Sequence, residues 1–445
     1  MADLKSMFSG VSEDIDKFYA SNEDGLLYVS HASILLSLSG KKFLFDPVLA
    51  KPPHLGSWLF YPKMQRDYRL LEVDAVFVSH QHQDHYDIDF LKLLPKSTMI
   101  YIVAGRPQFS TMLSREGITY VELPENEKFD LGDGVSCLGI LHEYNGIDAA
   151  IAISNGHFSV YHGNDCFVSN EKLKIIKDNY PSINVACVPF AYVHWYPFLL
   201  DEVDSSWKNS EADRLIKKYL NYGLQQVEFL CPDVAIPFGA NMFFNDDVFS
   251  EINKAVLSPF DFKNYAIDQG FPLEKCILPL FSGDSVLSVN LLSKRRLDIN
   301  QKSFSLEELH KGFNKYLASV KDEGTGFDSS QIEGLSIEEL QDFSFISERL
   351  NSAQNLPDEI IYISNSDNPA FGIIKINLKS HEVINVKDVT STTPFHHFRL
   401  SDLAYKAYMS QKFSFNEIVA SSRFRLIRSP NEYRLDALMI VNNVL

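Results

Sequence analysis

The sequence contains few cysteines, and none of them belongs to a C-x-x-C pair. Zinc ribbons and iron–sulfur clusters are built from closely spaced cysteines, so neither kind of site is expected. The number of cysteines, five, is odd, which argues against a disulfide framework and favours a reducing cytoplasm. The cysteines are Cys137, Cys166, Cys187, Cys231 and Cys276.

Long apolar runs are also missing. None reaches the roughly 18 residues that indicate a membrane-spanning helix. The first residues are acidic and lack an apolar h-region, so they do not resemble a signal peptide. We therefore expect a cytoplasmic protein that has no membrane partner.

Basic residues are outnumbered by acidic ones. The chain has 41 Lys and Arg against 58 Asp and Glu, a formal net charge of −17. Because such a surface repels phosphate backbones, we expect no nucleic-acid partner.

The length of 445 residues indicates more than one domain. Two apolar β-type runs within 26–50 flank Ser-Gly-Lys-Lys, a turn signal, and predict a hairpin that ends at Asp46-Pro47. A further apolar run at 74–80, a helical pattern at 88–94 and a strand at 98–104 indicate an α/β fold. The composition changes near residue 290, and a stretch rich in Gly, Asp and Ser follows. We predict an α/β domain over 1–294 and a smaller α+β domain over 295–445.

Three histidines and an aspartate lie within six residues, directly after the strand at 74–80. Imidazole nitrogens and carboxylate oxygens suit Zn, Fe or Mn. A tight loop at a strand end can turn His80 and His82 toward one ion, and Asp84 and His85 toward a second. Two ions about 3.5–4 Å apart can share a bridging water. We therefore predict two divalent metal ions as cofactors, Zn or Fe/Mn.

This H-x-H-x-D-H pattern resembles the signature of the metallo-β-lactamase superfamily. The strands that end near Asp46-Pro47 precede the motif, as they do in the family. The resemblance implies a four-layer αββα sandwich with the metals at one edge of two sheets. It further implies that His142 is the third histidine of the first ion, and that Asp165 bridges both ions.

One feature departs from the family pattern. A further histidine usually follows a late strand, and the late strand here, VAIPFGANMFF, contains none. Four polar residues lie near, but none is a clear substitute: Asn241, Asn245, Asp246 and Asp247. His194 could serve instead, and His31 is a second additional candidate.

Smaller stretches resemble the metallo-β-lactamase-type domain of CMP-N-acetylneuraminate hydroxylase. They are GSWLFYP at 56–62, HGNDCFVS at 162–169, FAYVHWYP at 190–197 and SSRFRLIRSPNEY at 421–433. That hydroxylase also carries a Rieske iron–sulfur domain, whose paired C-x-H and C-x-x-H motifs do not occur here. We therefore expect no electron delivery from within this chain.

Three functions remain open. The first is a hydrolase, in which a metal-bridging hydroxide attacks an ester, amide or phosphoester and Asp84 or Asp165 orients the water. The second is a di-iron oxygenase that takes external electrons. The third is a non-catalytic binding protein with a degraded site. The substrate is expected to be a small molecule, and Arg423 and Arg425 could bind an anionic group on it.

Overall fold

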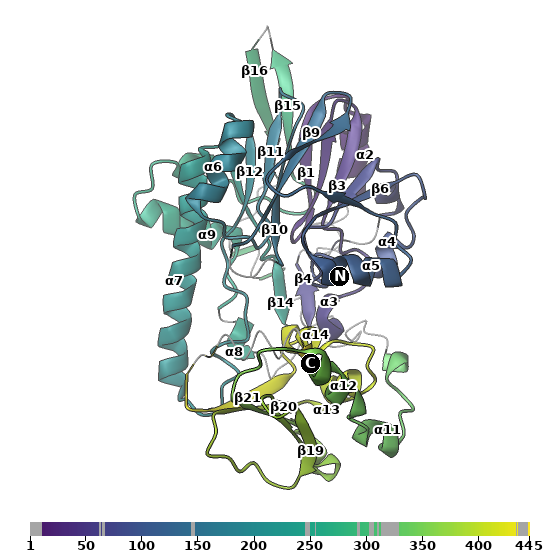
Figure 1. The fold of residues 1–445 in the computed structure, drawn as a ribbon. Coiled ribbons are helices and arrows are strands. Elements are labelled where there is room, and N and C mark those ends of the chain that lie inside the picture. Colours follow the sequence, from purple (N-terminus) through teal and green to yellow (C-terminus); the bar gives the residue numbers. More distant parts are fainter. Residues whose placement is uncertain are drawn as a thin grey trace.

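The protein folds into a large sandwich and a smaller C-terminal unit. In Figure 1 the sandwich lies at the top and the C-terminal unit at the bottom. In this computed structural model the described residues are 11–61, 64, 67–143, 147–244, 250–253, 255–291, 294–301, 307–308, 311–312, 329–432, 434 and 444–445.

The first sheet of the sandwich has eight strands in the order β16-β15-β1-β2-β3-β5-β6-β7. Strands β3, β5, β6 and β7 run parallel, whereas the strands on the other side are antiparallel. The hairpin predicted within 26–50 is β2–β3, and its turn is made by Ser39 and Gly40, both with positive φ. The bounds are β1 Asp24–Ser30, β2 Ser33–Leu38, β3 Lys41–Phe45, β5 Ala75–Phe77, β6 Met99–Val103, β7 Val121–Leu123, β15 Ser285–Leu291 and β16 Lys294–Asn300.

The second sheet has six strands in the order β13-β12-β11-β10-β9-β8. Its strands are largely continuous apolar runs, as expected for strands buried on both faces. The bounds are β8 Lys128–Gly132, β9 Val135–Leu141, β10 Ala149–Ser154, β11 Ser159–His162, β12 Val185–Pro189 and β13 Val234–Phe238.

Three apolar layers hold this sandwich together. Leu36, Phe77 and Ile151 belong to the layer between the two sheets. Helices on the outer face of the first sheet bury a second layer around Phe90 and Phe109, and helices on the outer face of the second sheet bury a third around Leu224. The expected four-layer αββα sandwich is thus confirmed. The helices are α2 Val11–Ala20, α4 Ile88–Leu91, α5 Pro107–Arg115, α6 Asn170–Asn179, α7 Ser205–Leu230, α8 Ser250–Asn253 and α9 Pro259–Asp268.

The C-terminal unit is a five-stranded sheet, ordered β19-β18-β17-β20-β21, with short helices packed on it. Its strands are β17 Ile360–Asn365, β18 Ile373–Asn377, β19 Glu382–Val386, β20 Phe395–Leu400 and β21 Phe424–Ser429. Its helices are α11 Ile337–Gln341, α12 Ser344–Ser352, α13 Asp402–Met409 and α14 Phe415–Ala420.

The boundary between the units lies later than the residue pattern suggests. Strand β16 continues the first sheet to Asn300, six residues past the division expected after residue 294. Most of the expected connector lies outside the described residues. The assignment of the two domains otherwise stays a prediction.

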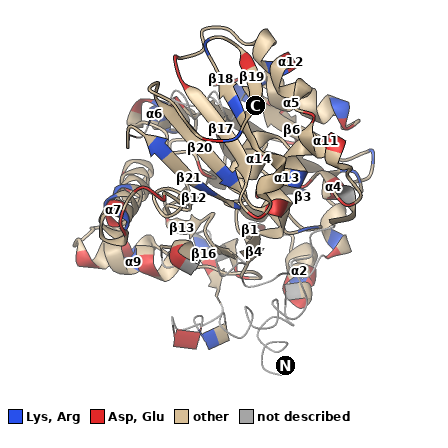
Figure 2. Ribbon diagram, turned by 90° about the horizontal axis from the view of Figure 1, so that it is seen from below, with Lys and Arg blue, Asp and Glu red and all other residues tan. Residues whose placement is uncertain are grey.

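The two units meet along several segments of the sandwich. The backbone of Leu426 in β21 pairs with Leu199 and Asp201 through hydrogen bonds of 2.9 Å each. A short ribbon of β4 (Trp58–Phe60) and β14 (Met242–Phe244) points toward the C-terminal unit, as does α3 (Pro53–Gly56) (Figure 1). Viewed from below, strands β20 and β21 carry basic positions near this contact (Figure 2). Among the described residues, no helix is long and apolar enough to span a membrane.

Candidate metal centre

The metal motif lies at the end of a strand in the middle of the first sheet. Strand β5 ends at Phe77, and Ser79 to His85 form the loop that follows. Strand β3 runs parallel to β5 with Phe45 beside Phe77, so Asp46 comes to the same edge. Asp165 reaches this edge from the second sheet, just after β11.

Two groups of three side chains offer ligand atoms that all lie within 4.8 Å of one another. The first group contains His80, His82 and Asp165, and the Nε2 of His80 lies only 2.8 Å from the Nδ1 of His82. The second group contains His31, Asp84 and His85. The structure thus places His80 and His82 in one group and Asp84 and His85 in the other, and their roles as metal ligands stay predictions.

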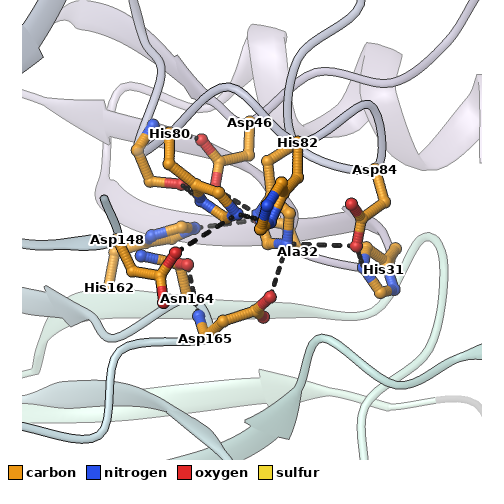
Figure 3. Close-up of polar contacts among 12 residues, drawn as sticks. His31, Ala32, Asp46, His80, His82, Asp84, Asp148, His162, Asn164 and Asp165 are labelled. Atoms are coloured by element: carbon orange, nitrogen blue, oxygen red, sulfur yellow. Dashed lines mark hydrogen bonds and ion pairs between the residues drawn. The ribbon is translucent and has the colours of Figure 1, made fainter. Parts of the chain in front are cut away.

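Asp165 and His85 connect the two groups. The Oδ2 of Asp165 lies 3.3 Å from the Nε2 of His85, and the Oδ2 of Asp84 lies 3.4 Å from the same nitrogen. These distances exceed those of a good charge-assisted hydrogen bond, about 2.7–2.9 Å. A cation among these atoms would satisfy all three, so the donor set fits the divalent ions that the sequence predicts. Figure 3 shows Asp165 pointing toward this cluster from the opposite sheet.

Polar partners behind the ligands fix their orientation. The Oδ2 of Asp46 lies 2.8 Å from the Nδ1 of His85 and accepts a 2.6 Å hydrogen bond from the Ser79 hydroxyl. The same hydroxyl lies 3.1 Å from the Nδ1 of His80. With Nδ1 engaged in both rings, each Nε2 is left for a metal, which is the usual arrangement of metal-binding histidines.

Burial and charge shift the pKa values of these groups in opposite directions. Burial, together with the neighbouring His85 and His82, holds the pKa of His80 well below its ordinary value, which keeps its lone pair available. Burial lowers the pKa of His85, but the carboxylates of Asp165 and Asp84 outweigh this and raise it well above its ordinary value. Burial raises the pKa of Asp84, but the charge of His85 and hydrogen bonds from its histidine neighbours hold it well below the usual range. A cation would take the place of the proton on His85.

His142 does not join either group of ligand atoms in the described residues. It follows β9, and its backbone N–H donates a 2.9 Å hydrogen bond to the carbonyl of Asp148. The Oδ1 of Asp148 lies 3.7 Å from the Nε2 of His80, so a carboxylate that the motif analysis overlooked lies near the first group. The role of His142 as a ligand stays a prediction.

In the described part of the chain, His194 also lies outside both groups. The Nδ1 of His194 accepts a hydrogen bond of 3.1 Å from the backbone of Tyr196, and burial lowers the pKa of His194 to about 4. Asn241 donates a 3.0 Å hydrogen bond to the hydroxyl of Tyr28, which in turn donates to the carbonyl of His31. Asn241 therefore supports His31 of the second group through the hydroxyl of Tyr28. Asn245, Asp246 and Asp247 lie outside the described residues.

The residue pattern does not indicate His54, yet its side chain lies within the metal centre. Its side chain is 2% exposed, and its Nε2 lies 3.0 Å from the Oδ1 of Asp84. The Nε2 of His31 lies 3.2 Å from the other oxygen of Asp84, so the two histidines hold this carboxylate from both sides. The only local signal for His54 is its position after Pro52 and Pro53, and two consecutive prolines indicate only a loop.

Left-handed backbone conformations gather around this centre. His31, Asp46, His54 and Asn164 all have positive φ, between 42° and 54°. Non-glycine residues in this region cost on the order of 1–3 kcal/mol each and tend to cluster at functional sites. The side-chain amide of Asn164 donates to the carbonyl of Ala149, and its oxygen accepts from the N–H of Asp165. Local strain therefore helps to aim the ligands.

Aromatic side chains of β4 line a small cavity beside the centre. The ring of Phe60 stacks on His31 with centroids 4.7 Å apart, and that of Trp58 meets His54 at 4.6 Å. Both aromatic residues line a cavity of about 110 Å³, together with Val48 and other residues of the loop before β4. Strand β4 is thus partly core and partly a cavity wall.

Comparison with known proteins agrees with this geometry. Residues 41–203 match the family model described as a beta-lactamase superfamily domain. The resemblance to the metallo-β-lactamase superfamily is confirmed. The matched segment contains the metal motif and Asp165, whereas His31 precedes it.

Curated relatives point to one branch of this superfamily. The chain is 27% identical over 233 residues to the cytidine monophosphate-N-acetylneuraminic acid hydroxylase of Danio rerio, covering 49% of this chain and 38% of the relative. The Mus musculus hydroxylase is 25% identical over 233 residues, covering 49% and 39%. The chain thus spans less than half the length of these relatives. A solved isothiocyanate hydrolase from Delia radicum gut bacteria shares 16% identity over 59% of this chain and 98% of its own, with a TM-score of 0.43.

Proposed function

We propose that the chain is a dinuclear metal-dependent hydrolase that acts on a small molecule. The observation that supports this most is the link between the two ligand groups, in which Asp165 lies with His80 and His82 and also contacts His85. One carboxylate can bind two ions through its two oxygens, whereas a neutral imidazole offers one lone pair. Asp165 is accordingly the bridging ligand in this proposal.

In this proposal the buried residues of the metal centre and its exposed carboxylate have different roles. Two divalent ions would supply a water of lowered pKa and stabilise a developing oxyanion. His80, Asp84 and His85 are buried and hold position, whereas the Asp165 side chain is 39% exposed. Substrate and water therefore approach on the Asp165 side. There the carboxylate of Asp165 would hold the two ions and orient the attacking water.

Hydrolysis is preferred because water is its only co-substrate. An oxygenase would need O₂ and electrons from a donor, and this chain contains no Rieske motif. The names of the curated relatives favour hydroxylation as the second candidate. A non-catalytic binding role is the third. An anionic substrate and a cytoplasmic location remain predictions.

Metal identity and stoichiometry, measured on protein purified without added metal, test the proposal. We expect about two Zn or Mn ions per chain and turnover of at least one substrate in a panel of esters, amides and phosphoesters. Asp165→Asn keeps the shape of the side chain but removes its charge, so we expect this variant to lose turnover together with bound metal. Two irons, a visible absorption band and reductant-dependent O₂ consumption would favour the hydroxylase instead. Absence of metal even after reconstitution would favour the binding role.

A further inference from the structure

A side chain within the metal motif contacts the C-terminal unit. Gln83 lies between His82 and Asp84, and its Nε2 donates a 2.5 Å hydrogen bond to the Oε1 of Glu417. Glu417 belongs to α14, and the two residues are separated by 334 positions in the sequence. The C-terminal unit therefore touches the metal loop itself.

The other end of the same amide reaches the second ligand group. The Oε1 of Gln83 accepts a 2.7 Å hydrogen bond from the backbone N–H of His54. The Nε2 of His54 lies 3.0 Å from the Oδ1 of Asp84, which is the oxygen not facing His31 and His85. A continuous path of hydrogen bonds thus runs from Glu417 through Gln83 and His54 to Asp84.

The backbone of His54 needs such support. Its φ of 54° is unfavourable for a residue with a Cβ, and the next residue, Leu55, also has a positive φ. The loop is held from the C-terminal unit a second time, because the Trp58 indole N–H donates a 3.1 Å hydrogen bond to the carbonyl of Ala420 at the end of α14. Helix α14 therefore supports the segment around His54 in two ways, indirectly through Gln83 and from the following strand through Trp58.

We propose that Glu417 is a positioning residue for the metal centre, which acts through Gln83 and His54 on Asp84. The C-terminal unit then serves to complete the second ligand group. This inference rests on the metal centre of the proposed function but not on the reaction. Partners behind the ligands of metal sites typically contribute about 10–100-fold to metal affinity.

An exchange of the two side chains tests the path. Glu417 accepts through Oε1 from Gln83 and through Oε2 from the N–H of Ser414, at 2.6 Å. Glu417→Gln alone has one carbonyl oxygen for these two donors, and Gln83→Glu alone places two carboxylates together. The double variant restores every hydrogen bond, because an amide at 417 can donate to a carboxylate at 83 and still accept from Ser414.

The readout is stepwise Zn²⁺ binding to the metal-free full-length chain, by competition with a chromogenic chelator at fixed pH. We expect each single variant to weaken binding of the second Zn²⁺ about 10-fold and the first by less, and the double variant to regain most of the loss. If Gln83→Glu binds the second Zn²⁺ as tightly as the wild type, the hydrogen bond between Gln83 and Glu417 does not support the second site and the proposal is overturned.

Ser414→Ala is the matched control. Its hydroxyl accepts from the N–H of Glu417 at 3.3 Å and donates to the Oε2 of Glu417 at 2.9 Å, so the variant weakens the start of α14 but leaves the Oε1 of Glu417 with its Gln83 partner. We expect lower thermal stability and unchanged Zn²⁺ affinity. An equal loss of affinity in Ser414→Ala and Glu417→Gln would reduce the effect to general destabilisation and refute the positioning role. Normal Zn²⁺ responses without turnover of any substrate would instead contradict the hydrolase and leave this inference standing.

Discussion

The Nδ1 of His85 lies 2.8 Å from the Oδ2 of Asp46, and both side chains are almost completely buried. Asp46 follows β3 and His85 belongs to the loop after β5, so the contact joins the ends of two parallel strands. The Oδ1 of Asp46 also accepts a 2.7 Å hydrogen bond from the N–H of Ser79. One carboxylate thus holds both the first residue and the last of the metal loop.

Asp46→Asn should weaken metal binding about 10–100-fold without unfolding the chain. The amide keeps the shape of the carboxylate but carries no charge and offers a donor toward His85. Metal affinity by chelator competition and circular dichroism are the measurements. The control is Asp89→Asn, since Asp89 forms an exposed ion pair with Lys51 in the same region. Equal affinities for both variants would show that Asp46 does not orient His85.

Asp165→Ala should lower the occupancy of both ions, whereas Asp84→Ala should mainly lower one. Asp165 lies with the His80 and His82 group and contacts His85 in the other, but Asp84 lies only with His31 and His85 in these groups. Metal content per chain, measured on folded variants, distinguishes the two. Two ions at wild-type occupancy in Asp165→Ala would assign the bridge elsewhere, and Asp148 would then be the next candidate.

The stability of the C-terminal unit should depend on pH through His397. Burial, with a smaller effect of Arg399, lowers the pKa of His397 to about 4, and its Nε2 lies 2.8 Å from the hydroxyl of Ser364. An unfolded histidine has a pKa of about 6.5, so the unfolded state binds the proton first as the pH falls. Stability is therefore full above about pH 6.5 and decreases toward pH 4, by at most about 3 kcal/mol.

His397→Gln removes this titration and can keep the hydrogen bond to Ser364. Urea unfolding at several pH values should show that the wild type loses more stability than the variant between about pH 6.5 and 4.5. Carboxylates titrate in both proteins, so the difference between the two curves is the informative quantity. Parallel curves would mean that His397 does not contribute.

Much of the sandwich and of the metal loop could be predicted from the sequence, because both depend on local patterns. The strand at 74–80 is an apolar run, and His80 to His85 follow it directly, so spacing alone placed four ligand candidates together. The β2–β3 turn was likewise marked by Ser39 and Gly40. The place of β16 in the first sheet could not be predicted in this way, because it rests on pairing with β15.

The remaining part of the site depends on contacts that no local pattern encodes. His54 reaches Asp84 through a left-handed turn, and the link from Gln83 to Glu417 requires the C-terminal unit to fold back on the sandwich. Asp46 looked like an ordinary strand-end aspartate until the parallel pairing of β3 with β5 placed it beside His85.

The arginines of β21 hold the two units together in this structure. The Nε of Arg428 donates a 2.7 Å hydrogen bond to Glu202 of the sandwich, and both side chains are largely buried. Arg425 donates to the carbonyl of Phe198 at 3.3 Å. The sequence suggested an anion-binding role for the arginines of this segment. These contacts favour a role in docking the C-terminal unit.

Arg428→Met should therefore destabilise the chain by about 3 kcal/mol, because it leaves the Glu202 carboxylate without its cation. The double variant with Glu202→Gln should recover part of this loss, since no buried charge remains. Arg399→Met is the matched control at the same contact. Arg399 pairs with Asp201 at 2.9 Å, but its side chain is 41% exposed, so its loss should cost less than about 1 kcal/mol. Urea unfolding measures all three variants. A chain with Arg428→Met that keeps wild-type stability would contradict the docking role of this ion pair.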